Sequence, residues 1–199
     1  MPSFIRATVL LALLACASAS AAPETYTIDS SHTYPSFKAA HIGAISFWRG
    51  KINQTSGAVV LDRAAKTGSI DIRMDMTTID FGHDKMNEHA KKEDIFDVAK
   101  YPTATYQSTK LVFTGDALTA VEGELSLHGV TKPVTLTVNQ FKCMPHPFYK
   151  REVCGADATA VIDRTDFGVS YGVGKAIPDG KVTLEIQVEA LKDEAAGPA

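Results

Sequence analysis

GELSLHGVTKPVTL, residues 123–136, decides the fold of this chain because two alternating apolar patterns flank a six-residue turn at 128–133. The apolar side chains alternate with polar ones on both arms: Val121, Leu125 and Leu127, then Val134, Leu136 and Val138. Successive side chains of a strand point to opposite faces, so each arm has one apolar face and one polar face. The stretch predicts a β-hairpin in an amphipathic antiparallel sheet.

The same alternation recurs along most of the chain. It is clear or recognisable in eight segments, of which 121–128 is the first arm of this hairpin: 26–28, 37–41, 50–61, 69–78, 103–113, 121–128, 154–163 and 181–191. Between residues 81 and 100, charges crowd around scattered apolar residues, which predicts one or two short helices ending before Tyr101 and Pro102. About eight or nine strands in so short a chain favour a closed barrel or a sandwich, and closure into a barrel removes exposed edges. We therefore expect an all-β, antiparallel β-barrel with a short helical insertion around residues 82–100.

The first 21 residues have the pattern of a secretory signal peptide. Arg6 precedes an apolar run at 7–15 that is too short to span a membrane. Ala19 and Ala21 supply the small residues of a cleavage site, so residues 1–21 are expected to be removed. The pattern predicts export to the periplasm or secretion.

After this leader, we expect one barrel domain at residues 22–194 and a flexible tail at 195–199. A competing interpretation of the leader makes Cys16 a lipidated cysteine that anchors the chain to a membrane. Leu14 fits that pattern poorly, so a soluble exported protein is the favoured interpretation.

The charge balance argues against a nucleic-acid partner. The chain has 20 Lys and Arg against 23 Asp and Glu, and loss of Arg6 with the leader lowers the formal charge from −3 to −4. A protein that binds a phosphate backbone carries a basic excess on one face, and no basic run is present in the sequence. Nucleic acid is therefore not an expected partner.

The two cysteines after the leader, Cys143 and Cys154, favour a disulfide in an oxidising compartment. Such a bond would stabilise the fold by about 3 kcal/mol in the loop-entropy view. Direct pairing of these residues, however, places Val138 opposite Thr159. The apolar face of one strand would then lie on the same side of the sheet as the polar face of the next. Either a bulge or an irregular segment at 144–147 absorbs the mismatch, or the thiols stay unpaired.

The sequence contains no pattern for catalysis, metal binding or a cofactor. His83 and His89 are six residues apart, whereas a zinc helix spaces its histidines three or four apart. Gly172 and Gly174 lack the third glycine and the helix of a dinucleotide site, and no nucleophile elbow occurs. We expect a protein that is not an enzyme, with no metal and no cofactor.

The interior of the predicted barrel is the feature that bears on function. An eight-stranded barrel either fills its interior with side chains or holds one small ligand. The inward face of 154–163 carries three small side chains: Ala156, Ala158 and Ala160. They leave room for a ligand unless large neighbours occupy it: Phe141, Phe167 and Trp48.

Several motifs together resemble those of the YceI-like family: SHTYPSFKAAHIGAISFWRGKI, DIFDVAKYPTATYQSTK, GELSLHGVTKPVTL, RTDFGV and KVTLEIQVEA. They occur in the order of the family and cover nearly the whole chain after the leader. The resemblance implies a lipocalin-like barrel, usually periplasmic, whose elongated apolar cavity holds a polyisoprenoid such as a quinone or an isoprenyl phosphate. It implies binding rather than catalysis, with a membrane-associated lipid donor or acceptor as a further partner.

The predicted ligand-binding residues combine the inward-facing positions with the family motifs: Phe37, His41, Phe47, Trp48, Ile72, Met74, Met76, Phe81, His89, Phe96, Tyr106, Leu125, Leu127, Ala156, Ala158 and Ala160. His41 shares strand parity with Phe37 and would donate a hydrogen bond to a quinone oxygen or a phosphate. A core histidine bonded to a backbone carbonyl is the competing interpretation. His89 falls where the family pattern has a histidine in its helical segment.

The chain departs from the family pattern near that helix, where Met86 and Asn87 replace the usual Arg and Asp and Ala90 replaces Leu. Loss of the arginine favours a neutral headgroup, such as a quinone or a fatty amide, over a diphosphate. The predicted function is an exported protein that sequesters or transports a long apolar lipid. Two alternatives stay open: a stress or interaction protein with a filled barrel, and an enzyme in which His41 and His89 converge on a bound lipid.

Overall fold

The computed structural model describes residues 22–194, so the predicted signal peptide, Cys16 and the predicted tail lie outside the described residues. Eleven strands form one sheet: β1 (Glu24–Ile28), β2 (Tyr34–Ala40), β3 (Phe47–Ile52), β4 (Thr55–Asp62), β5 (Thr67–Asp75), β6 (Ile79–Asp80), β7 (Thr103–Thr114), β8 (Ala117–Leu127), β9 (Val130–Pro145), β10 (Glu152–Asp163) and β11 (Lys181–Lys192). The helical elements are short: α1 (Asp84–Ala90), η1 (Ser30–His32), η2 (Ile42–Ala44), η3 (Met76–Thr78) and η4 (Arg164–Phe167). Within the described part of the chain, no helix is long and apolar enough to cross a membrane.

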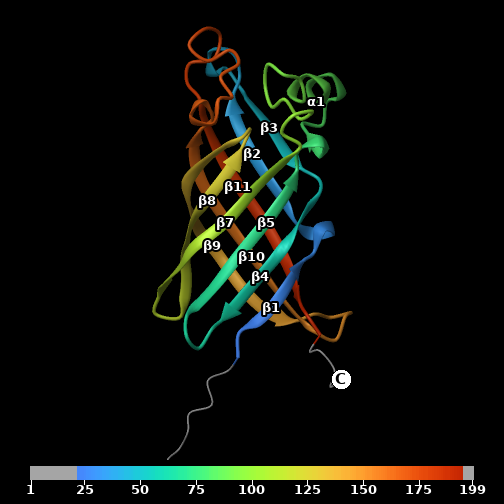
Figure 1. Cartoon of the computed structure of the whole chain (residues 1–199), viewed down its shortest axis with the longest axis vertical. Helices are drawn as coiled ribbons and strands as arrows, with labels where there is room; N and C mark the ends of the chain where they lie inside the picture. The colour runs from blue at the N-terminus through green and yellow to red at the C-terminus, as the bar shows by residue number, and fades with distance from the viewer. Residues whose placement is uncertain (1–21, 195–199) are drawn as a thin grey trace, which may run out of the picture.

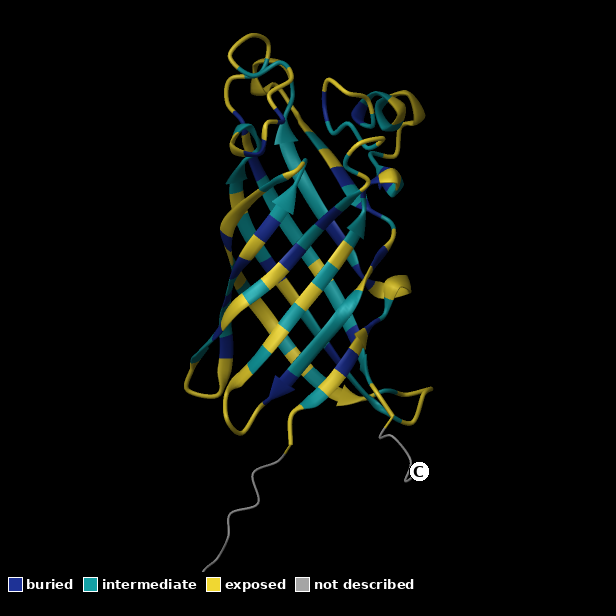
Figure 2. Cartoon of the chain, viewed as in Figure 1, coloured by how far each residue is buried: buried dark blue, intermediate teal, exposed yellow. Residues whose placement is uncertain are grey.

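Eight of these strands close into an antiparallel barrel, as the sequence predicts. Hydrogen-bonded neighbours run in the order β1-β4-β5-β7-β8-β9-β10-β11, and the pairing of β1 with β11 closes the ring. Figure 1 shows a tall barrel whose strands cross its axis obliquely. Along the strands in Figure 2, exposed and less exposed residues alternate, which reflects the inward and outward faces.

The two ends of the barrel differ. The upper end in Figure 1 carries the loop around η2, the segment between β10 and β11, and α1 with the turns that follow it. The lower end carries both described chain ends and the hairpin between β9 and β10. The helical insertion predicted at 82–100 therefore contains a single helix, followed by turns, at the upper end.

Three strand pathways on one side of the barrel are interrupted. η1 separates β1 from β2, Asn53 and Gln54 separate β3 from β4, and η3 separates β5 from β6. Above these breaks β2 pairs with β11, β3 pairs with β2, and β6 pairs only with β3. Because β7 pairs with β5 and not with β6, the upper wall between β6 and β7 is formed by the helical insertion rather than by paired strands.

The turn between β8 and β9 is shorter than predicted. It contains only His128 and Gly129, whose φ angles of 52° and 77° are those of a tight hairpin turn. β9 begins at Val130, so four residues that the sequence analysis assigned to the turn continue the strand. Pro133 lies within β9 opposite Glu124.

The mismatch between the cysteine pair and the apolar pattern is resolved by a bulge. Cys143 lies opposite Cys154, but the register shifts so that Ala158, rather than Thr159, pairs with Val138. Asn139 is the extra residue, and its side-chain amide donates a hydrogen bond to Asp157 Oδ1 over 2.7 Å. The disulfide Cys143–Cys154 is formed.

Candidate ligand cavity

The upper half of the barrel encloses an apolar cavity of about 200 Å³. It lies between the inner faces of β2 and β3 and the helical insertion, and the segment after β10 also contributes to its wall. An aromatic cluster forms one side, where the ring of Phe81 meets that of Phe37 edge to face at 5.4 Å between centroids and that of Trp48 at 6.2 Å. From the insertion, Ile95 and Phe96 complete the wall.

The lower half encloses a second apolar cavity of about 140 Å³, lined mainly by β4, β5, β7, β9, β10 and β11. Its small lining residues include Ala156 and Ala158 on β10, which the sequence predicts to face inward. The two cavities meet at Pro35 and Met74, which line both. The interior is therefore an elongated apolar space rather than a filled core.

Polar side chains are few along this space. In the upper cavity, the one charged lining residue is Arg164 at the start of η4. Its guanidinium donates hydrogen bonds of 2.7 Å to the carbonyl oxygens of Val169 and Tyr171, and burial lowers its pKa. Both acceptors belong to the segment after η4, so the main structural role of Arg164 is to fix that segment beside the cavity.

The lower cavity also has few free polar groups. The hydroxyl of Tyr106 donates to the carbonyl oxygens of Val121 and Val134, and burial raises its pKa. The hydroxyl of Thr33 donates to the carbonyl oxygen of Glu189 and accepts from its N–H. These two bonds take the place of strand pairing at the η1 interruption. The lining of the interior is therefore almost entirely apolar, which is typical of a site for an apolar ligand.

A network of charged groups closes the lower end of the barrel. Tyr26, which lines the lower cavity, donates its phenolic proton toward the carboxylates of Glu24 and Glu152. Arg63 bonds both carboxylates at 2.9 Å, and Lys192 bonds Glu24. The hydrogen bonds from Lys192 and Tyr26 lower the pKa of Glu24 from 4.5 to about 2. The network therefore forms a charged floor beneath the apolar interior.

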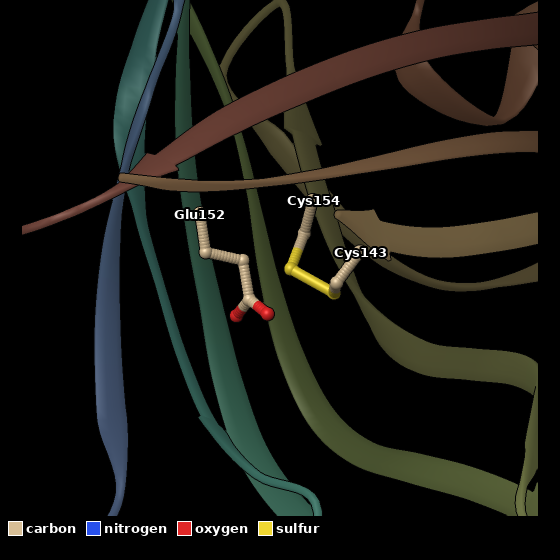
Figure 3. Close-up of side chains that lie close together, drawn as sticks. All are labelled: Cys143, Glu152 and Cys154. Carbon is tan, nitrogen blue, oxygen red and sulfur yellow. A yellow bond between two sulfur atoms is a disulfide. The ribbon is translucent and has the colours of Figure 1, made fainter. Parts of the chain in front are cut away.

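The disulfide lies beside this floor. Figure 3 shows the carboxylate of Glu152 next to the bond between Cys143 and Cys154. Within residues 22–194, these three are the one group of metal-ligating side chains close enough together to hold an ion. The cysteine sulfurs are bonded to each other and are not thiolates, so the oxidised protein has no metal-ligating pair here.

Of the predicted ligand-binding residues, twelve line one or both cavities: Phe37, Trp48, Ile72, Met74, Met76, Phe81, Phe96, Tyr106, Leu125, Leu127, Ala156 and Ala158. Four do not: His41, Phe47, His89 and Ala160. Phe47 is 53% exposed and lies opposite Ala40, so it belongs to the outer surface. Ala160 packs against a cluster of buried hydrophobic side chains that includes Phe167, and it does not line either cavity.

The two histidines lie outside the cavity lining for a structural reason. β2 ends at Ala40, so His41 lies beyond the strand and its ring packs edge to face against Trp48 at 5.6 Å. His89 lies on α1, where its ring meets Tyr171 at 4.9 Å and its Nε2 lies 3.2 Å from Asp94. They contact different groups and do not form a pair directed into the cavity.

Three lining features were not found by sequence reasoning. Pro35 and Arg164 line the upper cavity, and Tyr26 contributes to the floor of the lower one. Parity places Tyr26 inward, but its hydroxyl network combines the nearby Glu24 with charges from three distant positions, 63, 152 and 192. Nothing local in the sequence signals those contacts.

Comparison with known proteins gives a consistent match. A family model described as a YceI-like domain matches residues 26–190. A UPF0312 protein of Vibrio campbellii is 36% identical over 170 residues, covering 84% of this chain and 87% of the relative. A UPF0312 protein of Pseudomonas putida is 32% identical over 185 residues, covering 92% of this chain and 93% of the relative.

Solved structures share the fold at low sequence identity. The Campylobacter jejuni YceI protein aligns with a TM-score of 0.66 at 21% identity, covering 75% of this chain and 88% of that one. BcnA of Burkholderia cenocepacia aligns with a TM-score of 0.65 at 23% identity, covering 82% and 99%. A polyisoprenoid binding domain from Saccharophagus degradans aligns with a TM-score of 0.62 at 16% identity, covering 84% and 98%.

Proposed function

This chain belongs to the YceI-like family, and from that premise we propose that it is an exported carrier that holds a long apolar lipid inside its barrel. The carrying observation is the apolar interior, in which two neighbouring cavities of about 200 and 140 Å³ share Pro35 and Met74 as lining residues. The structurally similar domain from Saccharophagus degradans is described as polyisoprenoid binding, which supports an isoprenoid as the ligand class.

The size of the interior suits a single hydrocarbon chain. If a methylene-sized group takes about the 30 Å³ that a water molecule occupies in the liquid, the two cavities hold about a dozen such groups. At about 0.8 kcal/mol each, they contribute roughly 10 kcal/mol of gross transfer free energy. Subtracting at least about 4 kcal/mol for association leaves tens of micromolar affinity from the tail alone. Longer chains would extend past the upper cavity.

The headgroup we propose is neutral, such as a quinone ring. Met86 lines the upper cavity at the position where the family pattern has an arginine, and it brings no charge to the wall. Arg164 is the one cation there, and its guanidinium is already bonded to two carbonyl oxygens. An anionic diphosphate would therefore find no free cation among the residues that line the upper cavity.

We propose binding without catalysis. A reaction on the lipid would need titratable groups that converge on it, and the predicted pair His41 and His89 lies outside the cavity lining. The leader sequence and the disulfide Cys143–Cys154 support export to an oxidising compartment such as the periplasm. A filled barrel that binds nothing is disfavoured by the open apolar interior.

The test is to purify the protein from its native host under gentle conditions and identify any retained lipid by native mass spectrometry and organic extraction. We expect one long apolar molecule per chain. Trp48, the sole tryptophan of the chain, lines the upper cavity, so its fluorescence should be quenched by an added quinone. An empty protein whose Trp48 emission is unchanged by quinones or isoprenyl phosphates would refute the proposal.

A further inference from the structure

The upper end of the barrel, next to the upper cavity, exposes several large apolar side chains. Four large side chains are exposed there and together form what we call the mouth patch: Ile42 (57%), Ile45 (86%), Phe47 (53%) and Tyr171 (48%). The loop around η2 and the segment after η4 are joined by a hydrogen bond of 2.7 Å from Gly43 N to Ala176 O. Figures 1 and 2 show the two loops together at this end, with much of their surface exposed. Apolar side chains gathered beside a cavity indicate an interaction site.

Basic residues lie on the outer surface directly below the mouth patch. Residues 38–51 contain three Lys or Arg and no Asp or Glu. Lys38 and Arg49 face each other across the pair of β2 and β3, and Lys51 follows two residues along β3. We call these three the basic stripe. Lys38 is paired with Glu185 at 3.1 Å, whereas Arg49 is exposed.

The spacing of the two features fits a bilayer surface. Arg49 follows Phe47 by two strand residues, about 7 Å along the tilted strand, so the charge lies about 5 Å below Phe47 along the barrel axis. Interfacial segments bury their apolar side chains about 5–10 Å into the boundary between headgroups and acyl chains. When the mouth patch is at that depth, the basic stripe lies among the phosphates of the lipid headgroups.

We propose that the mouth patch inserts into the surface of an anionic bilayer, so that a lipid passes between the membrane and the upper cavity without crossing water. This inference rests on the proposed lipid-carrier function and adds the surface at which loading occurs. Tyr171 connects the two features, because it belongs to the mouth patch and also lines the upper cavity. The partner that fits the mouth patch is a lipid surface, because the patch lies beside the apolar upper cavity and has cations beneath it.

The lower end provides a matched control. Its hairpin exposes Phe148 (83%) and Tyr149 (56%), which resemble the mouth patch in size and exposure. Neither side chain lines a cavity, and the charged floor, in which Arg63 and Lys192 pair with the carboxylates of Glu24 and Glu152, lies at that end of the apolar interior.

The experiment is flotation of the purified protein with vesicles of equal parts phosphatidylglycerol and phosphatidylcholine, and with phosphatidylcholine alone. We expect flotation on the anionic vesicles that weakens with added salt. Ile45→Asp should reduce binding at least tenfold, and Arg49→Gln should reduce it about fivefold, the effect of one charge near the surface. Phe148→Asp should float like the parent protein.

A second measurement separates this inference from the proposed function. Uptake of a short-chain quinone dispersed in detergent is followed by quenching of Trp48, and Ile45→Asp should retain it because Ile45 does not line the cavity. Lost flotation with retained uptake supports docking. Two results would overturn docking alone. In the first, the parent protein takes up quinone but does not float. In the second, Phe148→Asp abolishes flotation and Ile45→Asp does not. Flotation without any uptake supports docking and overturns the carrier function.

Discussion

Replacing Ala158 with phenylalanine should shorten the ligand space without unfolding the barrel. Ala158 is 5% exposed, lies between Val138 and Ile186 on the neighbouring strands, and lines the lower cavity with both. The substitution adds a phenyl ring to a space of about 140 Å³. A closed apolar cavity of about 150 Å³ holds one benzene molecule, so the ring should fill the lower cavity almost completely.

The expected loss depends on the length of the ligand. The lower cavity has room for about five methylene-sized groups at about 30 Å³ each. At about 0.8 kcal/mol per group, excluding them costs about 4 kcal/mol, which is close to a thousandfold in affinity. A ligand short enough to end in the upper cavity should bind Ala158→Phe and the parent protein equally.

The assay is a titration of Trp48 fluorescence with quinones of increasing isoprenoid chain length. In the parent protein, affinity should rise with chain length until both cavities are filled. In Ala158→Phe, it should stop rising at the length that fills the upper cavity. Val161→Phe on the outer face of the same strand, where Val161 is 65% exposed, is the matched control and should bind like the parent. Equal affinity of Ala158→Phe and the parent for the longest quinone would refute the two-cavity reasoning.

Two further predictions concern the lower end of the barrel. The double variant Cys143→Ala with Cys154→Ala should lower the free energy of unfolding by about 3 kcal/mol, measured by urea denaturation; a midpoint equal to that of the oxidised parent would contradict this. The depressed pKa of Glu24 predicts stability that is fully present above pH 4.5 and is lost as the pH falls towards about 2. Glu24→Gln should flatten this part of the urea-midpoint profile, and an unchanged acid slope would show that other carboxylates cause it.

The barrel could be predicted because its signal is local. Alternation with a period of two needs only neighbouring residues, and it correctly placed Ala156, Ala158, Leu125 and Leu127 on the inside. It also showed that the cysteine pair conflicts with simple register. The structure confirms the bulge alternative and places it at Asn139, because its side chain bonds across to β10.

The length of the turn between β8 and β9 could not be predicted by the same reasoning. His128 and Gly129 form a tight turn, but histidine is not among the residues that usually mark one. The ring of His128 packs against Tyr101 at 4.6 Å, and its Nδ1 lies 3.1 Å from the carbonyl oxygen of Phe167. These contacts join segments that are distant in sequence, so no local pattern reports that they hold the histidine in a left-handed conformation.

Two of the strand interruptions did carry a sequence signal that alternation alone overlooks. Asp29 accepts a hydrogen bond from Ser31 N, and Asp75 accepts one from Thr77 N, each over 2.9 Å. An Asp followed two residues later by Ser or Thr favours a turn of this kind over an extended chain. Because predicted strand 69–78 continued through Asp75, the interruption at η3 was missed.

One of these interruptions changes how the barrel wall is built beside the upper cavity. At η3 the chain leaves the path of β5, and β6 pairs with β3 rather than with β7. The wall between β6 and β7 therefore depends on side chains of the helical insertion, such as Phe96, instead of a hydrogen-bonded ladder. Side-chain packing opens at lower cost than a strand pair, since no buried backbone groups lose their partners. The interruption at η3 thus lies beside the upper cavity, where Met76 and Ile79 form part of the lining.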